Sequence, residues 1–380
     1  MNLQNLKDYL DEAIHTLGLP GVDCIVYQNH REIFRHAAGY SDLQEKKPMA
    51  SDALYNIYSA TKVITCVAAL QLIEKEILNF SEPVSTYLPA YKDLYITIKD
   101  DAVRPAKTVL NIMHLFTMTS GISYQVDSLQ MKGFLAAKGG KFTSREFADA
   151  IAGQPLAFDP GDDWLYGFSH DVLGAVIEVA TGLSLGTYMR ENIFVPIGMS
   201  DTGFSVAEIK LPRMAPQYNY DLNTGEITKI SADCYGKFGD RQESGGSGLI
   251  SSCKDYILFA DALACGGEAK NGNRIISQHS LDLMGKNYLT GKTLTSFHQM
   301  IPRAGNGYGL GVSVLINPEA SCSLAPAGSF SWGGIGGVQN YFDRENRLSC
   351  FVAQHLLNSP KHLFEPKLRN ILYTALSDAG

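Results

Sequence analysis

Ser59 and Lys62 are the residues of this sequence whose types and spacing most directly indicate chemistry, in the run Ser59-Ala60-Thr61-Lys62. On a helix, residues i and i+3 face the same side, so this S-x-x-K spacing brings the lysine ammonium near the serine hydroxyl. A serine hydroxyl is a weak nucleophile until a neighbouring base takes its proton. A lysine can be that base only if burial or nearby positive charge lowers its pKa from about 10.4. The alternative is an N-capping serine beside a solvated lysine.

The residues that follow Ser59 predict the helix that positions this pair. Apolar side chains recur on one face of residues 59–78, at Val63, Val67, Leu70 and Ile73. Ser59 falls at the N-cap or in the first turn of this helix. A helix N-terminus carries partial positive charge and free backbone N–H groups, which favour an oxyanion.

The segment YNIYSATKVITCVAALQLIEKEILN, which contains Ser59, resembles the nucleophile helix of serine β-lactamases and penicillin-binding proteins. It is most similar to class C β-lactamases and the related family VIII carboxylesterases. The resemblance covers most of the chain in the expected order, through residues 114–124, 158–204, 245–267 and 331–346. It implies a β-lactamase/transpeptidase-like fold, in which the active site lies between an antiparallel sheet and a helical region. It also implies an acyl-enzyme formed on Ser59.

Tyr166 stands where this family has the tyrosine of its second motif, Tyr-x-Asn. The sequence here is Tyr166-Gly167-Phe168, so the tyrosine is present and the asparagine is not. The longer run YGFSHDVLG is more similar to the esterase branch. The resemblance implies that Tyr166 relays protons to the leaving group. The alternative is a core tyrosine whose hydroxyl is satisfied by a neighbour.

Trp332-Gly333-Gly334 matches the third motif of the family, which is Lys-Thr-Gly on an edge strand. Glycines let a backbone approach a substrate closely. The resemblance implies an oxyanion hole made by the backbone N–H groups of Ser59 and Ile335. Without the motif's lysine, Trp332 offers an apolar wall that favours neutral esters over anionic β-lactams. A tryptophan that merely covers a strand edge is the alternative.

Further candidates for the substrate pocket are Tyr124, Phe168 and His170, although a packing or surface role is the alternative for His170. No metal site is expected, because the nine histidines show no HExxH or HxH spacing. No cofactor is expected either. Residues 245–248, Gly-Gly-Ser-Gly, lack the pattern of a phosphate loop and predict a turn. The chain has no G-x-S-x-G elbow, which disfavours an α/β-hydrolase.

Secondary-structure patterns at the two ends of the chain predict a single sheet. A helix at residues 2–17 precedes a hairpin that turns at Asn29-His30, and a helical pattern at residues 107–117 is one of several in the middle of the chain. Period-two segments begin at residue 307, where the run GYGLG alternates like a strand. A closing helix is expected at residues 364–376. We therefore expect an α+β protein, in which residues 1–78 and 296–380 form an α/β sheet domain and residues 79–295 a mostly helical inserted region.

Composition and charge exclude several classes of partner. The 380 residues carry a net charge of −7 without a Lys/Arg-rich run, which disfavours nucleic acid and anionic membranes. No apolar stretch reaches about 18 residues, and the N-terminal segment is amphipathic, so a cytoplasmic protein is expected. The seven cysteines are expected to be buried, reduced thiols: Cys24, Cys66, Cys234, Cys253, Cys265, Cys322 and Cys350.

These observations predict a serine hydrolase, most simply a carboxylesterase acting on small or medium neutral esters. One alternative is a β-lactamase, or an amidase or peptidase for D-amino acids, with an amide substrate at the same site. A transacylase, in which an alcohol or amine replaces water, is another. An alternative from a different class is a catalytically silent, penicillin-binding-like protein that only binds a ligand. The oligomeric state and the acyl chain length stay open.

Overall fold

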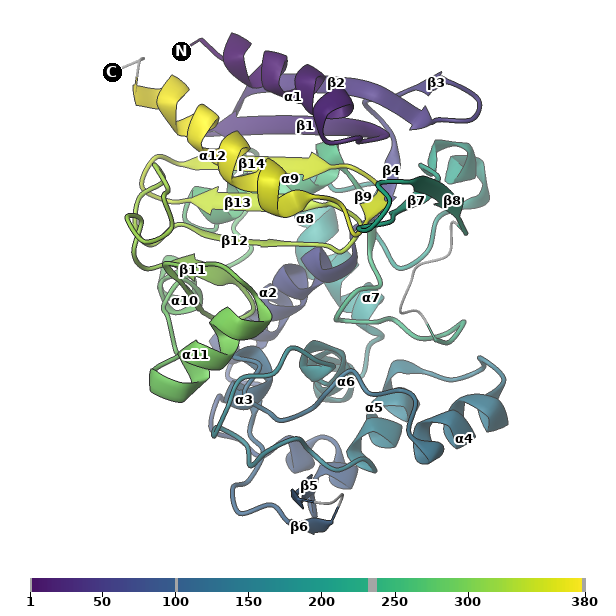
Figure 1. The fold of residues 1–380 in the computed structure, drawn as a ribbon. Helices are drawn as coiled ribbons and strands as arrows, with labels where there is room; N and C mark the ends of the chain where they lie inside the picture. Colours follow the sequence, from purple (N-terminus) through teal and green to yellow (C-terminus); the bar gives the residue numbers. More distant parts are fainter. Residues whose placement is uncertain (1, 100–101, 232–237, 378–380) are drawn as a thin grey trace.

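An eight-stranded antiparallel sheet, built from the two ends of the chain, lies at the centre of this computed structural model, which describes residues 2–99, 102–231 and 238–377 (Figure 1). The strand order is β10-β11-β12-β13-β14-β1-β2-β3, so the C-terminal β14 pairs with the N-terminal β1. The expected α+β fold is therefore confirmed. The strands are β1 Gly21–Gln28, β2 Arg31–Asp42, β3 Lys47–Pro48, β10 Asn306–Tyr308, β11 Ser313–Leu315, β12 Phe330–Gly333, β13 Gln339–Asp343 and β14 Leu348–Ala353.

Alternating residues of the central strands pack against helices on both faces of the sheet. On one face, Cys24 of β1 and Cys350 of β14 pack with α1 (Gln4–Thr16) and α12 (Lys361–Ser377). On the other face, Ile25 and Phe351 belong to the core that includes α2 (Thr61–Glu74) and α9 (Cys253–Ala264). Side chains alternate between faces along a strand, so a single strand supplies both cores.

The α2 helix lies in the interior, and every residue from Thr61 to Leu72 is buried. A helix that is buried all round belongs to the core of a larger protein rather than to its surface. The helix is therefore buried on all sides, and not only on the single apolar face that we expected for residues 59–78. The helix is also shorter than expected, because residues 58–60 form the separate 3-10 turn η1 (Tyr58–Ala60). The N-cap of α2 is Ala60 rather than Ser59, and it makes no side-chain capping hydrogen bond.

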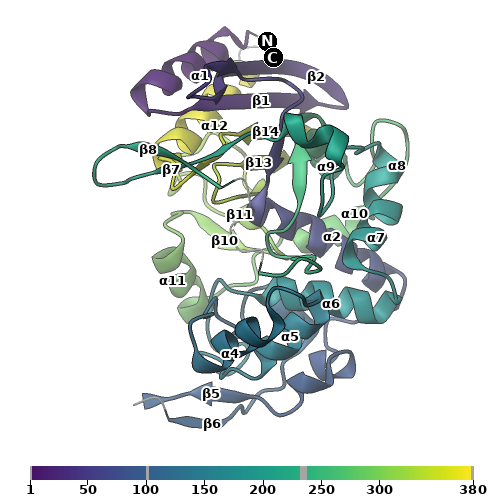
Figure 2. The same cartoon turned by 90° about the vertical axis from the view of Figure 1, so that its right-hand side faces the viewer.

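Helices α3 to α6 form the body below the sheet in Figure 1, and Figure 2 shows the β5–β6 hairpin at its far end. The remaining helices are α3 Ile112–Phe116, α4 Leu129–Lys138, α5 Ser144–Ala152, α6 Ser169–Thr181, α7 Leu185–Met189, α8 Val195–Ile197, α10 Gln278–Met284 and α11 Gly291–Met300. The remaining strands are β4 Leu54–Asn56, β5 Tyr95–Thr97, β6 Val103–Pro105, β7 Gln217–Tyr220, β8 Ile227–Ile230, β9 Ile250–Ser252 and β15 Leu356–Leu357.

Two expectations about elements need correction. The run GYGLG, expected to lie within one strand, ends β10 and turns into β11, with Gly311 at a φ of +81°. The segment 107–117, expected to be helical throughout, is helical only in α3. The division of the chain into a sheet domain and an inserted region, at residues 78 and 296, stays a prediction. The helix α9 belongs to the proposed inserted region by sequence but packs on the sheet strands β1 and β14.

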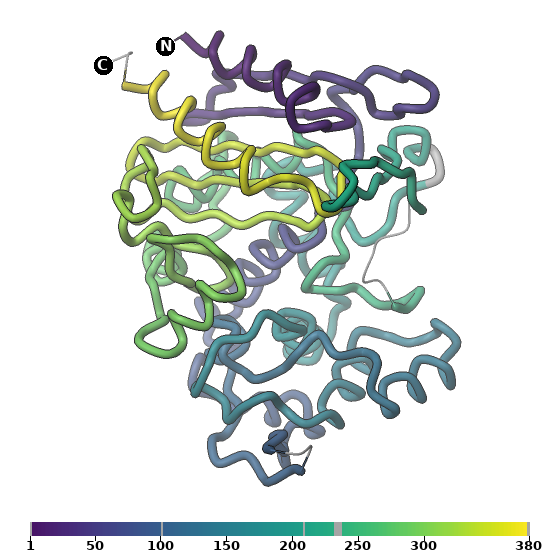
Figure 3. The backbone as a smooth tube through the Cα atoms, viewed as in Figure 1, coloured from purple at the N-terminus to yellow at the C-terminus, as the bar shows by residue number. Residues whose placement is uncertain are grey.

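The backbone trace in Figure 3 shows that both ends of the chain lie beside the same part of the sheet. Within the described residues, no single helix is long and apolar enough to cross a membrane, although the bent pair Ser169–Thr181 and Leu185–Ile197 meets that criterion together. Cys322 is exposed and Cys265 only half-buried, so the expectation of buried thiols is wrong for both; Cys234 lies outside the described residues.

Candidate active site

Ser59 lies on the short turn η1, immediately before α2 and next to a residue with a strained backbone conformation. Tyr58, its neighbour, has a φ of +49°, a left-handed conformation that costs free energy for a residue with a Cβ. The Tyr58 hydroxyl donates a hydrogen bond to Gln217 Oε1. Gly334 and Gly336 pack against this turn so closely that a Cβ on either would collide with Ile57 or Tyr58. The glycine-rich loop after β12 therefore lies directly against the turn that presents Ser59.

The Lys62 ammonium is completely buried and occupies the centre of the site. Its Nζ donates hydrogen bonds to Ser59 Oγ at 3.3 Å, to Tyr124 Oη at 2.9 Å and to the Gly246 carbonyl oxygen at 2.7 Å. It also lies 4.7 Å from the ring centre of Tyr166, a cation–π distance. The predicted neighbourhood of Ser59 and Lys62 is thus present, with two phenols beside it rather than one.

The surroundings of Lys62 favour its protonated form. Burial lowers its pKa, but Tyr124, Tyr166 and the buried Asp171 outweigh that effect, so the pKa lies above its ordinary value. Burial of the Tyr124 hydroxyl raises its pKa even though Lys62 lies beside it, which favours the neutral phenol. This arrangement is opposite to the lowered pKa that a free lysine base requires.

A buried carboxylate supports the loop whose carbonyl accepts a hydrogen bond from Lys62. Asp171 Oδ1 on α6 accepts hydrogen bonds from Ser244 Oγ at 2.5 Å and from the Gly246 N–H at 3.4 Å. The same loop is tied to α2 by Thr65 Oγ1, which donates to the Gly245 carbonyl at 2.7 Å. The Gly246 carbonyl can therefore face Lys62 only while this loop stays docked on α2 and α6.

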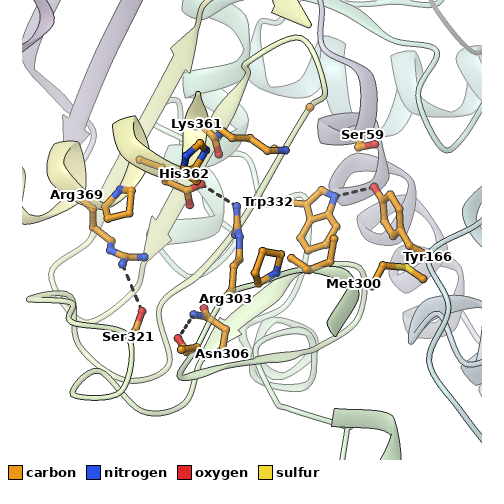
Figure 4. A pocket seen from close by; sticks show the side chains of 18 of the residues that line it. Ser59, Tyr166, Met300, Arg303, Asn306, Ser321, Trp332, Lys361, His362 and Arg369 are labelled. Atoms are coloured by element: carbon orange, nitrogen blue, oxygen red, sulfur yellow. Dashed lines mark hydrogen bonds and ion pairs between the residues drawn. The ribbon is translucent and has the colours of Figure 1, made fainter. Parts of the chain in front are cut away.

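Tyr166 and Trp332 meet on the other side of Ser59. Trp332 Nε1 donates a 3.1 Å hydrogen bond to Tyr166 Oη, and the ring centres are 5.5 Å apart (Figure 4). Because the phenol oxygen accepts this bond, its own O–H remains available to another partner. Trp332 is 5% exposed, so its indole is a wall of the site rather than a cover on a free strand edge.

A cavity of about 470 Å³ opens from Ser59 and has the size of a small-molecule site. At the Ser59 end it is lined by Tyr166, Trp332, Gly333, Gly334 and Ile335. The hydrogen bonds of the turn after β12 run from Gly334 N–H to Val338 O at 2.8 Å and from Gly337 N–H to Gly334 O at 3.2 Å. They leave the Ile335 N–H outside the turn's own bonding.

The structure brings together most of the predicted site residues and separates two of them. Ser59, Tyr166, Trp332, Gly333, Gly334 and Ile335 line the cavity, and Tyr124 contacts Lys62. His170 is fully buried, with Nε2 3.5 Å from Cys66 Sγ, and does not line the cavity. Phe168 is 5% exposed and packs edge-on against Tyr124. Both residues were expected to bind substrate, and both instead pack behind the site, because α6 turns their side chains into the core.

The sequence reasoning missed Asp171 and the Gly246 carbonyl. Residues 245–248 were predicted to form only a turn, and an aspartate in the helical run after Tyr166 had no spacing motif to distinguish it. The glycines of this loop did carry a signal. A Cβ at Gly245 would collide with the His170 carbonyl, and one at Gly246 with Asp171, so only glycine permits this close docking.

One cluster elsewhere offers potential metal ligands. His30, Asp261 and Cys265 place three ligand atoms within 4.8 Å of one another, among the described residues. His30 Nδ1 and Asp261 Oδ2 already form a 2.7 Å hydrogen bond, and burial raises the pKa of the Cys265 thiol to about 12. A protonated thiol and a bonded carboxylate give this cluster a structural explanation without an ion.

A serine and a lysine on one turn, at the boundary between an antiparallel sheet and a helical body, define a class of proteins to which the comparisons assign this chain. It belongs to the Beta-lactamase family, whose model matches residues 6–374. The esterase EstB of Burkholderia gladioli is 29% identical over 370 residues, covering 91% of this chain and 88% of that protein. The acyltransferase calJ of Penicillium decumbens is 30% identical over 344 residues, covering 85% and 80%.

Solved structures have the same fold. EstCE1, described as a hydrolase with promiscuous acyltransferase activity, superposes with a TM-score of 0.82 at 22% identity, covering 97% of this chain and 98% of its own. Simvastatin synthase (LovD) of Aspergillus terreus gives a TM-score of 0.80 at 21% identity, with 98% of each chain covered. The expected β-lactamase/transpeptidase-like fold is confirmed by these matches.

Proposed function

We propose that this chain is a serine hydrolase that forms an acyl-enzyme on Ser59 and acts as a carboxylesterase on small and medium esters. The observation that carries the proposal is the contact of 3.3 Å between Lys62 Nζ and Ser59 Oγ at the end of an open cavity. The esterase EstB, which covers nine-tenths of the chain, is a relative of the same reaction class.

Tyr166 and Lys62 act as one proton-transfer unit in this proposal. Lys62 is an ammonium at rest, so the unit must first release one proton to solvent before it can accept the Ser59 proton. Tyr166 is the better partner of the two phenols, because it lines the cavity with Ser59, whereas Tyr124 does not. Ser59 Oγ then attacks the ester carbonyl, and its proton passes through the unit to the departing alcohol oxygen.

The second half of the cycle uses the same groups. A water molecule replaces the alcohol and gives its proton to the unit as it attacks the acyl carbonyl. The bond from the acyl carbon to Ser59 Oγ then breaks, and the unit returns the proton to Ser59 Oγ as the acid leaves. The backbone N–H groups of Ser59 and Ile335 hold the oxyanion in both halves, and the Ile335 N–H is not used by its own turn. Loss of one such donor typically lowers kcat by about 10²- to 10³-fold.

Trp332 makes the surroundings of the scissile bond apolar, because it stands where the family's third motif has a lysine. Esters whose groups next to that bond are uncharged are therefore preferred. A β-lactamase, or an amidase or peptidase for D-amino acids, uses the same nucleophile but gains less from an apolar wall at this position. A silent binding protein has no need for Ser59, Lys62 and Tyr166 together.

Acyl transfer to an alcohol or amine is the second candidate function. Its support is the relatives whose names give that activity, among them the acyltransferase calJ. The chemistry differs from hydrolysis only in the group that attacks the acyl-enzyme, so both outcomes come from one intermediate. Adding alcohols of increasing size to an ester assay separates them, because transfer yields a new ester and hydrolysis yields only the acid.

The test is a paired assay of the purified protein against p-nitrophenyl butyrate and a chromogenic cephalosporin, with Ser59→Ala as the control. We expect ester turnover that disappears in Ser59→Ala and little hydrolysis of the cephalosporin. Strong cephalosporin turnover would move the protein to the β-lactamase branch. No turnover of either compound that depends on Ser59 would overturn the esterase proposal.

A further inference from the structure

Cationic side chains line the cavity beyond Ser59. Figure 4 shows Ser59 and Tyr166 at one end and Arg369 at the other, with Trp332, Arg303 and Lys361 between them. The lining residues from α12 share one face of that helix: Lys361, His362, Glu365, Pro366 and Arg369. The first residue of α12 is Lys361, so the partial positive charge of the helix N-terminus adds to theirs.

The single carboxylate among these lining residues is already engaged. Arg303 Nη2 forms a 2.9 Å ion pair with Glu365, and its Nη1 donates a 3.2 Å hydrogen bond to Ser331 Oγ. Arg303 also lies over the ring of Trp332, 5.9 Å from the ring. It is therefore held as part of the cavity wall, and its charge and that of Glu365 largely cancel.

Lys361 and Arg369 have no carboxylate partner within the described part of the chain. Lys361 is exposed to the cavity, and Arg369 makes only a long hydrogen bond of 3.4 Å to Ser321 Oγ, while its buried Nε has no partner there. Two cationic side chains without an ion pair thus line one cavity of a chain whose net charge is −7. Apolar side chains line the same cavity, among them Met300, Ile301 and Pro302.

We propose that the wall of the cavity formed by α12 is an anion subsite, centred on Lys361, that selects esters carrying a carboxylate remote from the scissile bond. The inference rests on the proposed esterase function and deepens it. The uncharged middle of such a substrate would lie along Trp332 and Met300, and its carboxylate would reach α12. The apolar wall next to Ser59 and the positive charge beyond it then serve different parts of one molecule.

The first test compares matched ester pairs, because the subsite can face either the acyl group or the alcohol. One pair is p-nitrophenyl pentanoate with mono-p-nitrophenyl glutarate, and the other is propyl butyrate with its counterpart bearing a carboxylate at the end of the alcohol. The measured quantity is the ratio of kcat/KM for the charged ester to that for the neutral ester. In the pair whose carboxylate lies on the side of the ester that faces α12, we expect Lys361→Gln to lower this ratio roughly tenfold.

The matched control is Lys367→Gln, which removes the same charge from the same helix. Lys367 is exposed, lies outside the cavity and forms a loose 3.6 Å pair with Glu12. The ratios should stay at the wild-type value in this variant. Unchanged ratios in Lys361→Gln for both pairs, or an equal fall in Lys367→Gln, would overturn the subsite.

A binding measurement separates this inference from the esterase proposal. Titration of Ser59→Ala with monoethyl glutarate does not depend on turnover. Adding Lys361→Gln to that variant should weaken the affinity roughly tenfold, whereas adding Lys367→Gln should not. Equal affinities would refute the subsite even if esters are hydrolysed. Weakened binding without any turnover that depends on Ser59 would leave the subsite standing and refute the esterase.

Discussion

Trp332 donates the hydrogen bond that orients Tyr166, with 3.1 Å between its Nε1 and the Tyr166 Oη. The residue that replaces the family's third-motif lysine thus contacts the tyrosine of the second motif. A lysine in this position would place a charge beside the substrate, whereas the indole supplies one neutral donor and an apolar face. The pair links substrate preference and proton transfer in a single contact.

Trimming the indole tests this link. Trp332→Phe keeps an aromatic ring but removes the donor, so Tyr166 becomes less well oriented, and we expect kcat for p-nitrophenyl butyrate to fall about tenfold. Trp164→Phe is the control, since that indole also stacks on Tyr166 while its Nε1 has no partner among the described residues. Similar losses of kcat in the two variants would mean that packing, and not the hydrogen bond, supports Tyr166.

The two phenols around Lys62 should differ in importance. Tyr166→Phe removes a member of the proton-transfer unit and should lower kcat by about 10²- to 10⁴-fold. Tyr124→Phe removes an oxygen that accepts a hydrogen bond from Lys62 but does not line the cavity, so a loss of about tenfold is expected. Measuring kcat of both variants by steady-state kinetics shows which phenol contributes more to catalysis. A greater loss in Tyr124→Phe would exchange the assigned roles.

Asp171 should set the pH range of activity through Lys62. Its buried charge raises the pKa of Lys62, and the active form of the unit lacks one proton, so activity rises with pH. Asp171→Asn removes the charge while an amide oxygen can still accept from Ser244. The pKa of Lys62 then falls, and the rising limb of the kcat/KM profile should move to lower pH.

The matched control for Asp171→Asn is Asp255→Asn. Asp255 is also buried and accepts a hydrogen bond from a hydroxyl, that of Thr202, but it is not among the groups that shift the pKa of Lys62. Its pH profile should coincide with that of the wild-type protein. A rising limb that stays in place in Asp171→Asn would remove this aspartate from the account.

Gly334 should be intolerant of a side chain, because a Cβ there would collide with the Ile57 carbonyl beside the Ser59 turn. We expect Gly334→Ala to lower both the free energy of unfolding, by about 1–3 kcal/mol, and the rate of ester turnover. Gly133→Ala is the control, since nothing lies within 4 Å of its Cβ on α4. That helix should gain about 0.5–1 kcal/mol. Full activity in Gly334→Ala would show that the close approach is dispensable.

The parts of the fold that follow from local patterns could be predicted from the sequence. Period-two segments predicted the terminal strands, and the Asn29-His30 turn of the hairpin has φ values of +48° and +66°, as a tight hairpin turn requires. The i, i+3 spacing of Ser59 and Lys62 correctly predicted that their side chains meet, because this contact depends only on the geometry of one helical turn. The resemblance then supplied Tyr166 and Trp332, which lie 166 residues apart.

Contacts set by distant docking could not be predicted in this way. Lys62 and Gly246 are 184 residues apart, and only the seating of that loop on α2 makes the carbonyl a partner. His170 is buried because its face of α6 points into the core, although its position shortly after Tyr166 in the sequence favoured a place in the substrate pocket. The cationic wall of the cavity forms because α12 packs beside the loop that carries Arg303, and these two segments share no sequence motif.

Identification of the residue that becomes acylated tests the central claim most directly. The protein is treated with a fluorophosphonate, and the modified peptide is mapped by mass spectrometry, with Ser59→Ala and Lys62→Met measured in parallel. The account predicts one adduct on Ser59, none in Ser59→Ala and strongly slowed labelling in Lys62→Met. An adduct on another residue, or labelling of Ser59 at an unchanged rate without Lys62, would contradict it.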